Sequence, residues 1–341
     1  MKKSITNKRK SDHLQITLQE NVSSSLSTGL EKLHFSHQAL PEINYDEVDP
    51  SLEFLGKKLS FPLLISSMTG GTPEAGRINR NLALAAEKLN VGLALGSQRA
   101  AIEDPAQADS FRIRDLAPSA PLFANLGAVQ LNYGFGLEEC QRAVDMIQAD
   151  GLILHLNPLQ EVLQPEGETN FRGILTKIRS ICRKLEHPVI VKEVGFGISP
   201  RIAKRLYEAG VWAVDVAGAG GTSWSQVEKF RAKTESDELI AESFHDWGIS
   251  TAESLRTARR AALKLRLIAS GGIRSGVDMA KCITLGAELC GIAIPFLKAA
   301  TISSKSVENV VEVFRKQFRV AMFVSGVACL NDLSKIQLLE N

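Results

Sequence analysis

The stretch "ASGGIRSGVDMAKCITLGA", residues 269–287, decides the fold. An apolar run enters Gly271-Gly272, and a helical pattern begins at Ser275. Glycines let the backbone approach an anion closely, and the free amides and dipole of a helix start favour negative charge. The stretch therefore predicts a strand, a phosphate-binding turn and a helix. A turn that needs glycine only for its conformation is the simpler alternative.

Apolar runs like the one before Gly271 recur along the chain. Eight of them begin at Pro62, Val91, Pro121, Gly151, Pro188, Val211, Arg266 and Leu289. They are continuously apolar, as strands buried on both faces should be. Helical patterns separate them at 78–90, 137–149, 199–210, 250–265 and 275–287. This alternation predicts an α/β fold, the (β/α)8 TIM barrel. The rival, a doubly wound sheet, needs fewer strands and an early GxGxxG, which the first run lacks.

The predicted barrel occupies residues 61–341, and residues 1–60 form an N-terminal extension. The basic "KRK" at 8–10 is either a solvated tail or an arm that closes over an anionic substrate. Such an arm would be disordered without substrate, because it contains little apolar surface. About fifty residues separate the sixth and seventh strands, and an insertion of that length predicts a lid or a partner contact.

Composition excludes several classes of protein. The chain has 341 residues, 44% of them hydrophobic, and a net charge of +2, so it can bury a large core and has no global field that favours nucleic acid. No apolar stretch is long enough for a membrane span, and the basic N-terminus lacks the apolar segment of a secretory signal. Five dispersed cysteines indicate reduced thiols and a cytoplasmic location.

Polar or glycine residues end all eight predicted strands. In chain order these ends are Ser67 to Thr69, Ser97 to Arg99, Asn125, His155 to Glu161, Lys192-Glu193, Gly218 to Thr222, Gly271-Gly272 and Ala293. Barrel active sites form at the carboxyl ends of the strands, so eight such ends in register predict a site better than chance packing does. Lys192 could neutralise an anionic ligand, or pair with Glu193 or another carboxylate.

The segment "HLNPLQE", 155–161, is the densest of these ends. Four of its seven side chains can bind a metal, donate a hydrogen bond or move a proton. Arg99 and Arg274 could bind an anion beside it, although either could equally form a surface salt bridge.

Several motifs carry a resemblance that covers nearly the whole chain. They include "RKSDH", "SSMTGGT", "HLNPLQE", "QPEGETNF", "DVAGAGGTSW" and "ASGGIRSG". With them the sequence resembles the type 2 isopentenyl-diphosphate isomerases, which are FMN-dependent (β/α)8 barrels. The chain departs from that pattern at Ala217, where relatives often have serine, and in "GIAIPFL", which lacks a polar residue before "PFL".

The resemblance implies a reaction and its cofactors. Isopentenyl diphosphate and dimethylallyl diphosphate interconvert as one proton adds and another leaves. Reduced FMN, NADPH as its reductant and Mg2+ are implied, as is a homotetramer or homo-octamer. Protonation of the alkene would create a tertiary cation, so the site must exclude water and hold an electron-rich group beside that cation.

The resemblance also implies roles for individual residues. Gln160 and His155 would support reduced FMN in catalysis, and Glu161 would bind the metal. The substrate would contact Arg9, Lys10, Ser97, Gln98, Arg99, His155, Asn157 and Gln160. FMN would contact Ser67, Met68, Thr69, Ser97, Asn125, Lys192, Thr222, Gly271, Gly272, Ile273, Arg274, Ala293 and Ile294.

Three other functions are possible on such a barrel. An FMN-dependent 2-hydroxy-acid oxidase carries a histidine base and an arginine after strand six, where this chain has "GAGGTSW". A relative of inosine-monophosphate dehydrogenase needs a nucleophilic cysteine in that loop, and none lies between Val211 and Trp247. A non-catalytic phosphate sensor would not need all eight polar strand ends.

Overall fold

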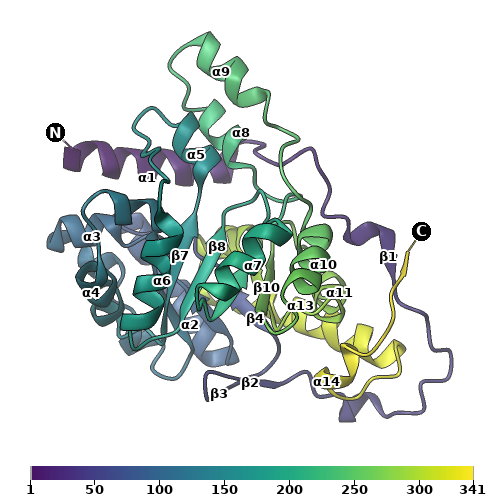
Figure 1. Ribbon diagram of the computed structural model, residues 1–341. Coiled ribbons are helices and arrows are strands. Elements are labelled where there is room, and N and C mark those ends of the chain that lie inside the picture. Colours follow the sequence, from purple (N-terminus) through teal and green to yellow (C-terminus); the bar gives the residue numbers. More distant parts are fainter. Residues whose placement is uncertain (1, 341) are drawn as a thin grey trace.

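The chain folds into a closed barrel of eight parallel strands, in a computed structural model that describes residues 2–340 and the side chains of residues 9–340 (Figure 1). The barrel strands are β4 (Leu63–Ile65), β5 (Gly92–Ala94), β6 (Leu122–Gly127), β7 (Gly151–Leu156), β8 (Val189–Glu193), β9 (Ala213–Asp215), β10 (Arg266–Ser270) and β11 (Leu289–Ile292). Each begins within two residues of a predicted apolar run. The predicted (β/α)8 fold is therefore confirmed.

Helices surround this barrel. The longer ones are α2 (Pro73–Leu89), α4 (Leu137–Ile147), α6 (Ile174–Lys184), α7 (Pro200–Glu208), α10 (Thr251–Ala261), α11 (Gly276–Thr284) and α13 (Ser304–Val324). Shorter ones are α3 (Arg99–Glu103), α5 (Pro158–Leu163), α12 (Ile294–Ala300) and α14 (Leu330–Leu333), with 3-10 turns η1 (Leu30–Lys32), η2 (Tyr45–Glu47), η3 (Pro105–Ser110), η4 (Arg114–Leu116) and η5 (Ala128–Asn132). Helix α2 starts before the predicted 78–90 because Thr72 caps it and Pro73 suits a first turn.

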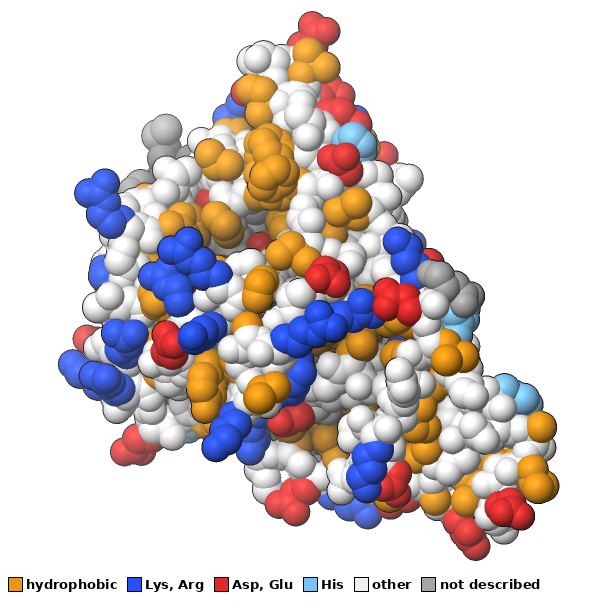
Figure 2. Space-filling model, turned by 45° about the vertical axis from the view of Figure 1, so that its right-hand side comes forward, with side chains coloured by type: hydrophobic (Ala, Val, Ile, Leu, Met, Phe, Trp, Pro, Cys, Tyr) orange, Lys and Arg blue, Asp and Glu red, His pale blue; other side chains and the backbone are white. Residues whose placement is uncertain are grey.

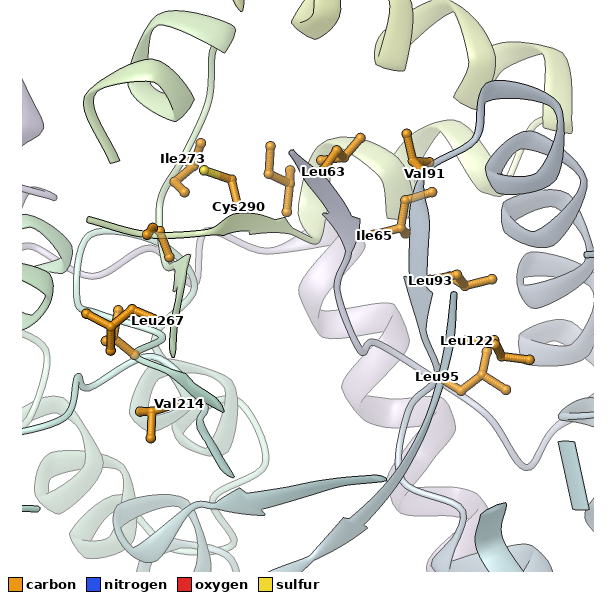
Figure 3. Packing of buried hydrophobic residues seen from close by; sticks show 14 of the residues in the cluster. Leu63, Ile65, Val91, Leu93, Leu95, Leu122, Val214, Leu267, Ile273 and Cys290 are labelled. Atoms are coloured by element: carbon orange, nitrogen blue, oxygen red, sulfur yellow. The ribbon is translucent and has the colours of Figure 1, made fainter. Parts of the chain in front are cut away.

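Successive side chains along each barrel strand point alternately out toward the helices and into the barrel, and this divides the core into two parts. Leu63 and Ile65 of β4 belong to the cluster that faces the surrounding helices (Figure 3), whereas Leu64 belongs to a cluster inside the barrel. The inner cluster takes one residue from each of the eight strands. It also contains Phe54 and Leu59 of the hairpin β2 (Leu52–Phe54) and β3 (Lys57–Leu59). The hairpin therefore closes the end of the barrel opposite the polar strand ends.

The N-terminal extension packs on the barrel. Helix α1 (Lys2–Gln19) contacts α3 and α8 (Figure 1). Leu14 on this helix is buried. Strand β1 (Leu33–His34) pairs with β12 (Leu339–Glu340), so the extension is also held near the end of the chain. The expected arm is thus a helix in this structure. Its disorder in the absence of substrate stays a prediction.

The insertion between β9 and β10 contains α8 (Trp224–Lys229) and α9 (Glu235–Glu242). Both project from the rim of the barrel beside α1 and α5 (Figure 1). This is the position expected of a lid or a partner contact.

The turn after β10 packs backbone against backbone on the loop after β9. Gly271 and Gly272 have φ angles of 103° and 72°, which disfavour any residue with a Cβ. A Cβ on Gly271 would lie 2.0 Å from the Gly218 carbonyl oxygen, and one on Gly272 would lie 2.2 Å from that of Gly220. The turn thus needs glycine for close approach as well as for conformation.

We expect Gly271→Ala to destabilise the fold more than Gly134→Ala. Gly134 has a similar φ of 94° but open space where a Cβ would stand, so its substitution costs backbone strain alone, about 1–3 kcal/mol. Gly271→Ala adds the clash with Gly218. Urea unfolding of the two variants measures the difference, and equal losses of unfolding free energy would contradict the close approach.

Candidate active site

One large cavity opens at the carboxyl ends of the strands. Its empty space is about 1670 Å³, including the part open to solvent. Helix α1 contributes one wall through Arg9, Lys10, His13 and Leu14. Each of the eight strands contributes a residue at or just beyond its end.

Almost all of the predicted site residues line this cavity. They are Arg9, Lys10, Ser67, Met68, Thr69, Ser97, Arg99, Asn125, His155, Asn157, Gln160, Glu161, Lys192, Thr222, Gly271, Gly272, Ile273, Arg274, Ala293 and Ile294. Gln98 is the exception. Its fully buried side chain donates to the Ala143 carbonyl and accepts from the Asn125 amide, so it does not line the cavity, and the expected contact of Gln98 with substrate stays a prediction.

The arm places cations over the cavity. Lys10 Nζ donates to the Ser97 carbonyl at 2.9 Å and lies 5.1 Å from the centre of the Phe111 ring. Burial, aided by the charge of Arg9, lowers the pKa of Lys10 to about 7. Burial also lowers the pKa of Arg9. Neither side chain forms an ion pair with another described residue, so the rim favours an anionic ligand.

A carboxylate that sequence reasoning missed lies opposite the arm. Glu228 of α8 is 2% exposed, and its Oε1 lies 2.8 Å from His13 Nε2. Burial opposes its ionisation, but the bond to His13 and the charges of His13 and Arg231 leave the pKa of Glu228 lowered. The Nε2 of Gln160 donates to it at 3.4 Å. The arm, α8 and the loop after β7 are therefore joined through one carboxylate.

Trp224 adds an aromatic contact to this junction. Its ring lies 5.0 Å from the His13 ring, nearly edge-on, and both residues line the cavity. His13 and Trp224 were missed as well, because their meeting depends on how α1 docks on α8.

The loop after β7 presents oxygen atoms to the cavity. Glu161 is 6% exposed, and the amide of Asn157 donates to its Oε1 at 2.9 Å. Its Oε2 accepts from Gln164 and from the Glu168 amide. Asn157 Oδ1 is buried without a hydrogen-bond partner among the described residues. A buried carboxylate beside an unsatisfied amide oxygen suits a hard cation such as Mg2+.

This loop holds no complete metal cage. Across residues 2–340, no group of three or more histidine, cysteine or acidic side chains could hold a metal ion. Mg2+ commonly binds through one or two carboxylates, waters and substrate phosphates, so Glu161 fits that pattern only together with an anionic ligand.

Arg99 lies at the rim but is already paired. Its guanidinium makes two bonds to Glu168, at 2.7 and 2.8 Å, and a third to Glu103 at 2.8 Å. The salt-bridge interpretation is therefore correct for the structure as described, and an anion would have to share Arg99 with these carboxylates.

Three polar residues connect the ends of β4, β6 and β7. His155 Nδ1 lies 2.8 Å from Asn125 Oδ1, and Asn125 Nδ2 donates to Ser67 at 2.9 Å. Burial, together with the charges of Lys192 and Arg9, lowers the pKa of His155 to about 4. His155 is thus neutral at pH 7, with Nδ1 placed to donate to Asn125.

The other side of the cavity fits a phosphate. Gly271 to Arg274 and Ala293-Ile294 line it together, so two turns present backbone to one space. Glycine at 271 and 272 lets that backbone approach a ligand as well as the Gly218 to Gly221 loop. Arg274 supplies a cation there. This half of the cavity has the features of a mononucleotide phosphate site.

Comparison with known proteins identifies the family of this chain. Residues 159–340, more than half of the chain, match the family model of FMN-dependent dehydrogenases. The chain is 52% identical to the isopentenyl-diphosphate delta-isomerase of Nostoc sp. over 96% of this chain and 94% of that protein. It is 49% identical to that of Rickettsia bellii over 98% of both chains. The chain belongs to the isopentenyl-diphosphate delta-isomerase family.

Solved structures confirm the architecture of this delta-isomerase family member. The crystal structure of mandelate oxidase superposes with a TM-score of 0.68, over 97% of this chain and 94% of that one. Sequence identity is 16%, so this likeness shows the fold alone.

We expect His155 to make stability depend on pH. The pKa of His155 is about 4 in the folded chain and near 6.5 when unfolded, so the unfolded chain binds the proton first. The free energy of unfolding from this residue is fully present above about pH 6.5 and is lost as pH falls toward about 4. Urea unfolding between pH 4.5 and 7 should show a shallower decline for His155→Asn than for the wild type. Two results would contradict this expectation. One is a shallower decline in the exposed control His37→Asn, and the other is a decline in His155→Asn that is as steep as in the wild type.

Proposed function

We propose that this chain isomerises isopentenyl diphosphate to dimethylallyl diphosphate, reversibly, at reduced FMN. The observation that carries the proposal is one cavity with a mononucleotide phosphate site on one side and, on the other, cations of α1 facing the Asn157–Glu161 oxygens. Relatives that are 52% and 49% identical to this chain, over 94% or more of either chain, carry that activity in their names.

FMN fits the side of the cavity formed by β8 to β11 and their loops. The phosphate would lie at Gly271 to Arg274 and at Ala293-Ile294, and the ring would extend past Lys192 and Asn125 toward Met68. Bound reduced FMN would supply an electron-rich ring that stabilises developing positive charge and exchanges the reacting proton. The match to FMN-dependent dehydrogenases supports this cofactor.

The diphosphate would bind between the arm and the loop after β7. Lys10 and Arg9 supply positive charge, and Glu161 with Asn157 Oδ1 would hold Mg2+ against the same phosphates. Gln160 would bind near the reacting carbons without adding charge, and its bond to Glu228 fixes its side-chain amide. Neutral His155 can donate or accept a hydrogen bond without repelling Lys192.

The arm also has a chemical task. Leu14 of α1 and Trp224 of α8 line the cavity beside His13, so the two helices together give the mouth an apolar and aromatic wall. A tertiary cation reacts readily with water, and a covered mouth excludes water during the reaction.

Three further points belong to the proposal. NADPH would reduce the flavin, and the five unpaired cysteines support a cytoplasmic location. No described helix is long and apolar enough to span a membrane.

A homotetramer or homo-octamer is supported by exposed apolar side chains on the projecting elements, namely Val162, Phe230, Leu239, Ile240 and Trp247. Figure 2 shows hydrophobic side chains gathered on this projecting part. Light scattering would measure the assembly.

The proposed reaction has a direct test. The protein is incubated without oxygen with FMN, NADPH, Mg2+ and isopentenyl diphosphate, and the dimethylallyl isomer is measured. Product should form only when FMN and its reductant are both present. In a separate assay with oxygen as the electron acceptor, oxidation of lactate, glycolate or mandelate by a protein that shows no isomerisation would favour the oxidase alternative instead.

Glu161→Gln should weaken the dependence on Mg2+. The amide keeps the shape but loses the charge that attracts the cation, so the Mg2+ concentration for half-maximal rate should rise by about ten- to a hundredfold. Flavin binding, followed by absorbance, should persist. The control Glu168→Gln removes a nearby carboxylate that bonds Arg99, and its Mg2+ titration should stay unchanged. If the Mg2+ titration of Glu161→Gln equals that of the wild type, the metal must bind elsewhere.

Lys10 should make the affinity for the diphosphate substrate depend on pH. The pKa of Lys10 is about 7 without ligand, and a diphosphate favours the charged form. Below pH 7 the charge is already present, whereas above it binding must also take up a proton. Affinity should therefore fall by up to about tenfold per pH unit. Calorimetry between pH 7 and 9 measures this, with Lys10→Arg as control because arginine stays charged. Equal pH dependence in both proteins would exclude Lys10 as the cause.

A further inference from the structure

Three side chains from neighbouring strands meet beneath the cavity. They are Lys192 of β8, Asp215 of β9 and Ser270 of β10, and they are 8%, 1% and 4% exposed. Lys192 and Ser270 line the cavity, whereas Asp215 lies behind them. Sequence analysis left open whether Lys192 serves a ligand or a carboxylate, and here it contacts both the cavity and an acid.

The three side chains form a closed triangle. Lys192 Nζ donates to the Ser270 hydroxyl at 3.0 Å, and that hydroxyl donates to Asp215 Oδ1 at 2.5 Å. The ammonium is also 2.9 Å from Asp215 Oδ2, as an ion pair whose angles are not those of a hydrogen bond. The Ala217 amide donates to Oδ1 at 3.2 Å and fixes the carboxylate.

No other carboxylate in the described chain is within ion-pair distance of Lys192. Glu193 is adjacent in sequence, but its Oε2 accepts from the amides of Val194, Gly195 and Phe196. The pKa of Glu193 is raised to about 7 by burial.

The remaining charged groups near Lys192 do not offset its charge. On β7, His155 has its pKa lowered to about 4, so it is neutral near pH 7, and Arg9 of α1 is positive. Gly291 of β11 supplies no side chain, and a Cβ there would lie 3.6 Å from Asp215 Oδ2. Asp215 is thus the counter-charge of a buried ammonium.

We propose that Asp215 is a positioning residue that keeps Lys192 charged and fixed against bound FMN. The inference rests on the proposed FMN site. A buried ammonium without a counter-charge releases its proton readily, because burial disfavours the charged form. On this proposal, the charge of Asp215 keeps Lys192 protonated whether the flavin is oxidised or reduced. The Ser270 hydroxyl fixes the position of the Lys192 ammonium group.

This role changes the proton count of flavin reduction. In the wild type, neutral oxidised FMN takes two electrons and one proton to reach its anionic reduced form, and Lys192 keeps its proton throughout. On this proposal, the Asp215→Asn variant has Lys192 neutral before reduction, and the new negative charge then draws a proton onto it. The variant therefore takes two electrons and two protons.

The experiment is a potentiometric titration of FMN bound to the full chain between pH 7 and 9, with dithionite as reductant and redox dyes as indicators. With one additional proton taken up, the equilibrium constant for reduction changes by a further factor of ten for each pH unit. For a two-electron couple, this changes the midpoint potential by about 30 mV per pH unit. The slope of midpoint potential against pH should therefore be steeper by that amount in Asp215→Asn than in the wild type.

Two variants identify the group that takes up the proton. The double variant Asp215→Asn/Lys192→Met should return to the wild-type slope, because it has no ammonium to protonate. Ser270→Ala keeps the ion pair and should also keep the wild-type slope. An unchanged slope in Asp215→Asn, or a steep slope that survives in the double variant, overturns the proposal.

Failure to fold is also informative. If Asp215→Asn does not fold and the double variant does, an uncompensated Lys192 is the cause, which supports the pairing. If neither folds, Asp215 acts through something other than Lys192 and the proposal falls. Absence of FMN binding by the wild type would instead refute the proposed function, so the two failures are distinguishable.

Discussion

The pairing of β4 with β11 closes the barrel, and the rest of the structure depends on it. Cys290, Gly291 and Ile292 of the last strand are in register with Leu63, Leu64 and Ile65 of the first. Closure gives all eight strands one direction and one rim, so side chains more than 200 residues apart in sequence face one space. Without this register the arm, the oxygens of the β7 loop and the glycine turns would share no cavity.

Much of this arrangement follows from local sequence. Strands buried on both faces must be continuously apolar, which is why all eight runs predicted their strands within two residues. Once the barrel is predicted, the residues after each run must lie at the rim, and almost every predicted site residue does. Gln98 differs because its side chain turns outward to the Ala143 carbonyl, and no local pattern reveals that direction.

Long-range docking explains what sequence reasoning missed. Glu228 lies in an insertion whose pattern is that of an ordinary polar helix, and only the approach of α1 gives it His13 and Gln160 as partners. The ion pair of Lys192 with Asp215 likewise depends on the register of β8 and β9, in which the two residues are directly opposite. In both cases the decisive interaction joins segments whose separation in sequence carries no periodic signal.

The hairpin β2–β3 has a kinetic consequence. Phe54 packs edge-on against Phe123 and Trp212, so the far end of the barrel is plugged by aromatic rings. Among the described residues, the cavity lies at the carboxyl ends of the strands, where α1 contributes one wall. In the proposed arrangement, a diphosphate under the arm would stand between the flavin and solvent, so the flavin would enter first and leave last. Substrate should therefore slow the escape of the cofactor by blocking its way out.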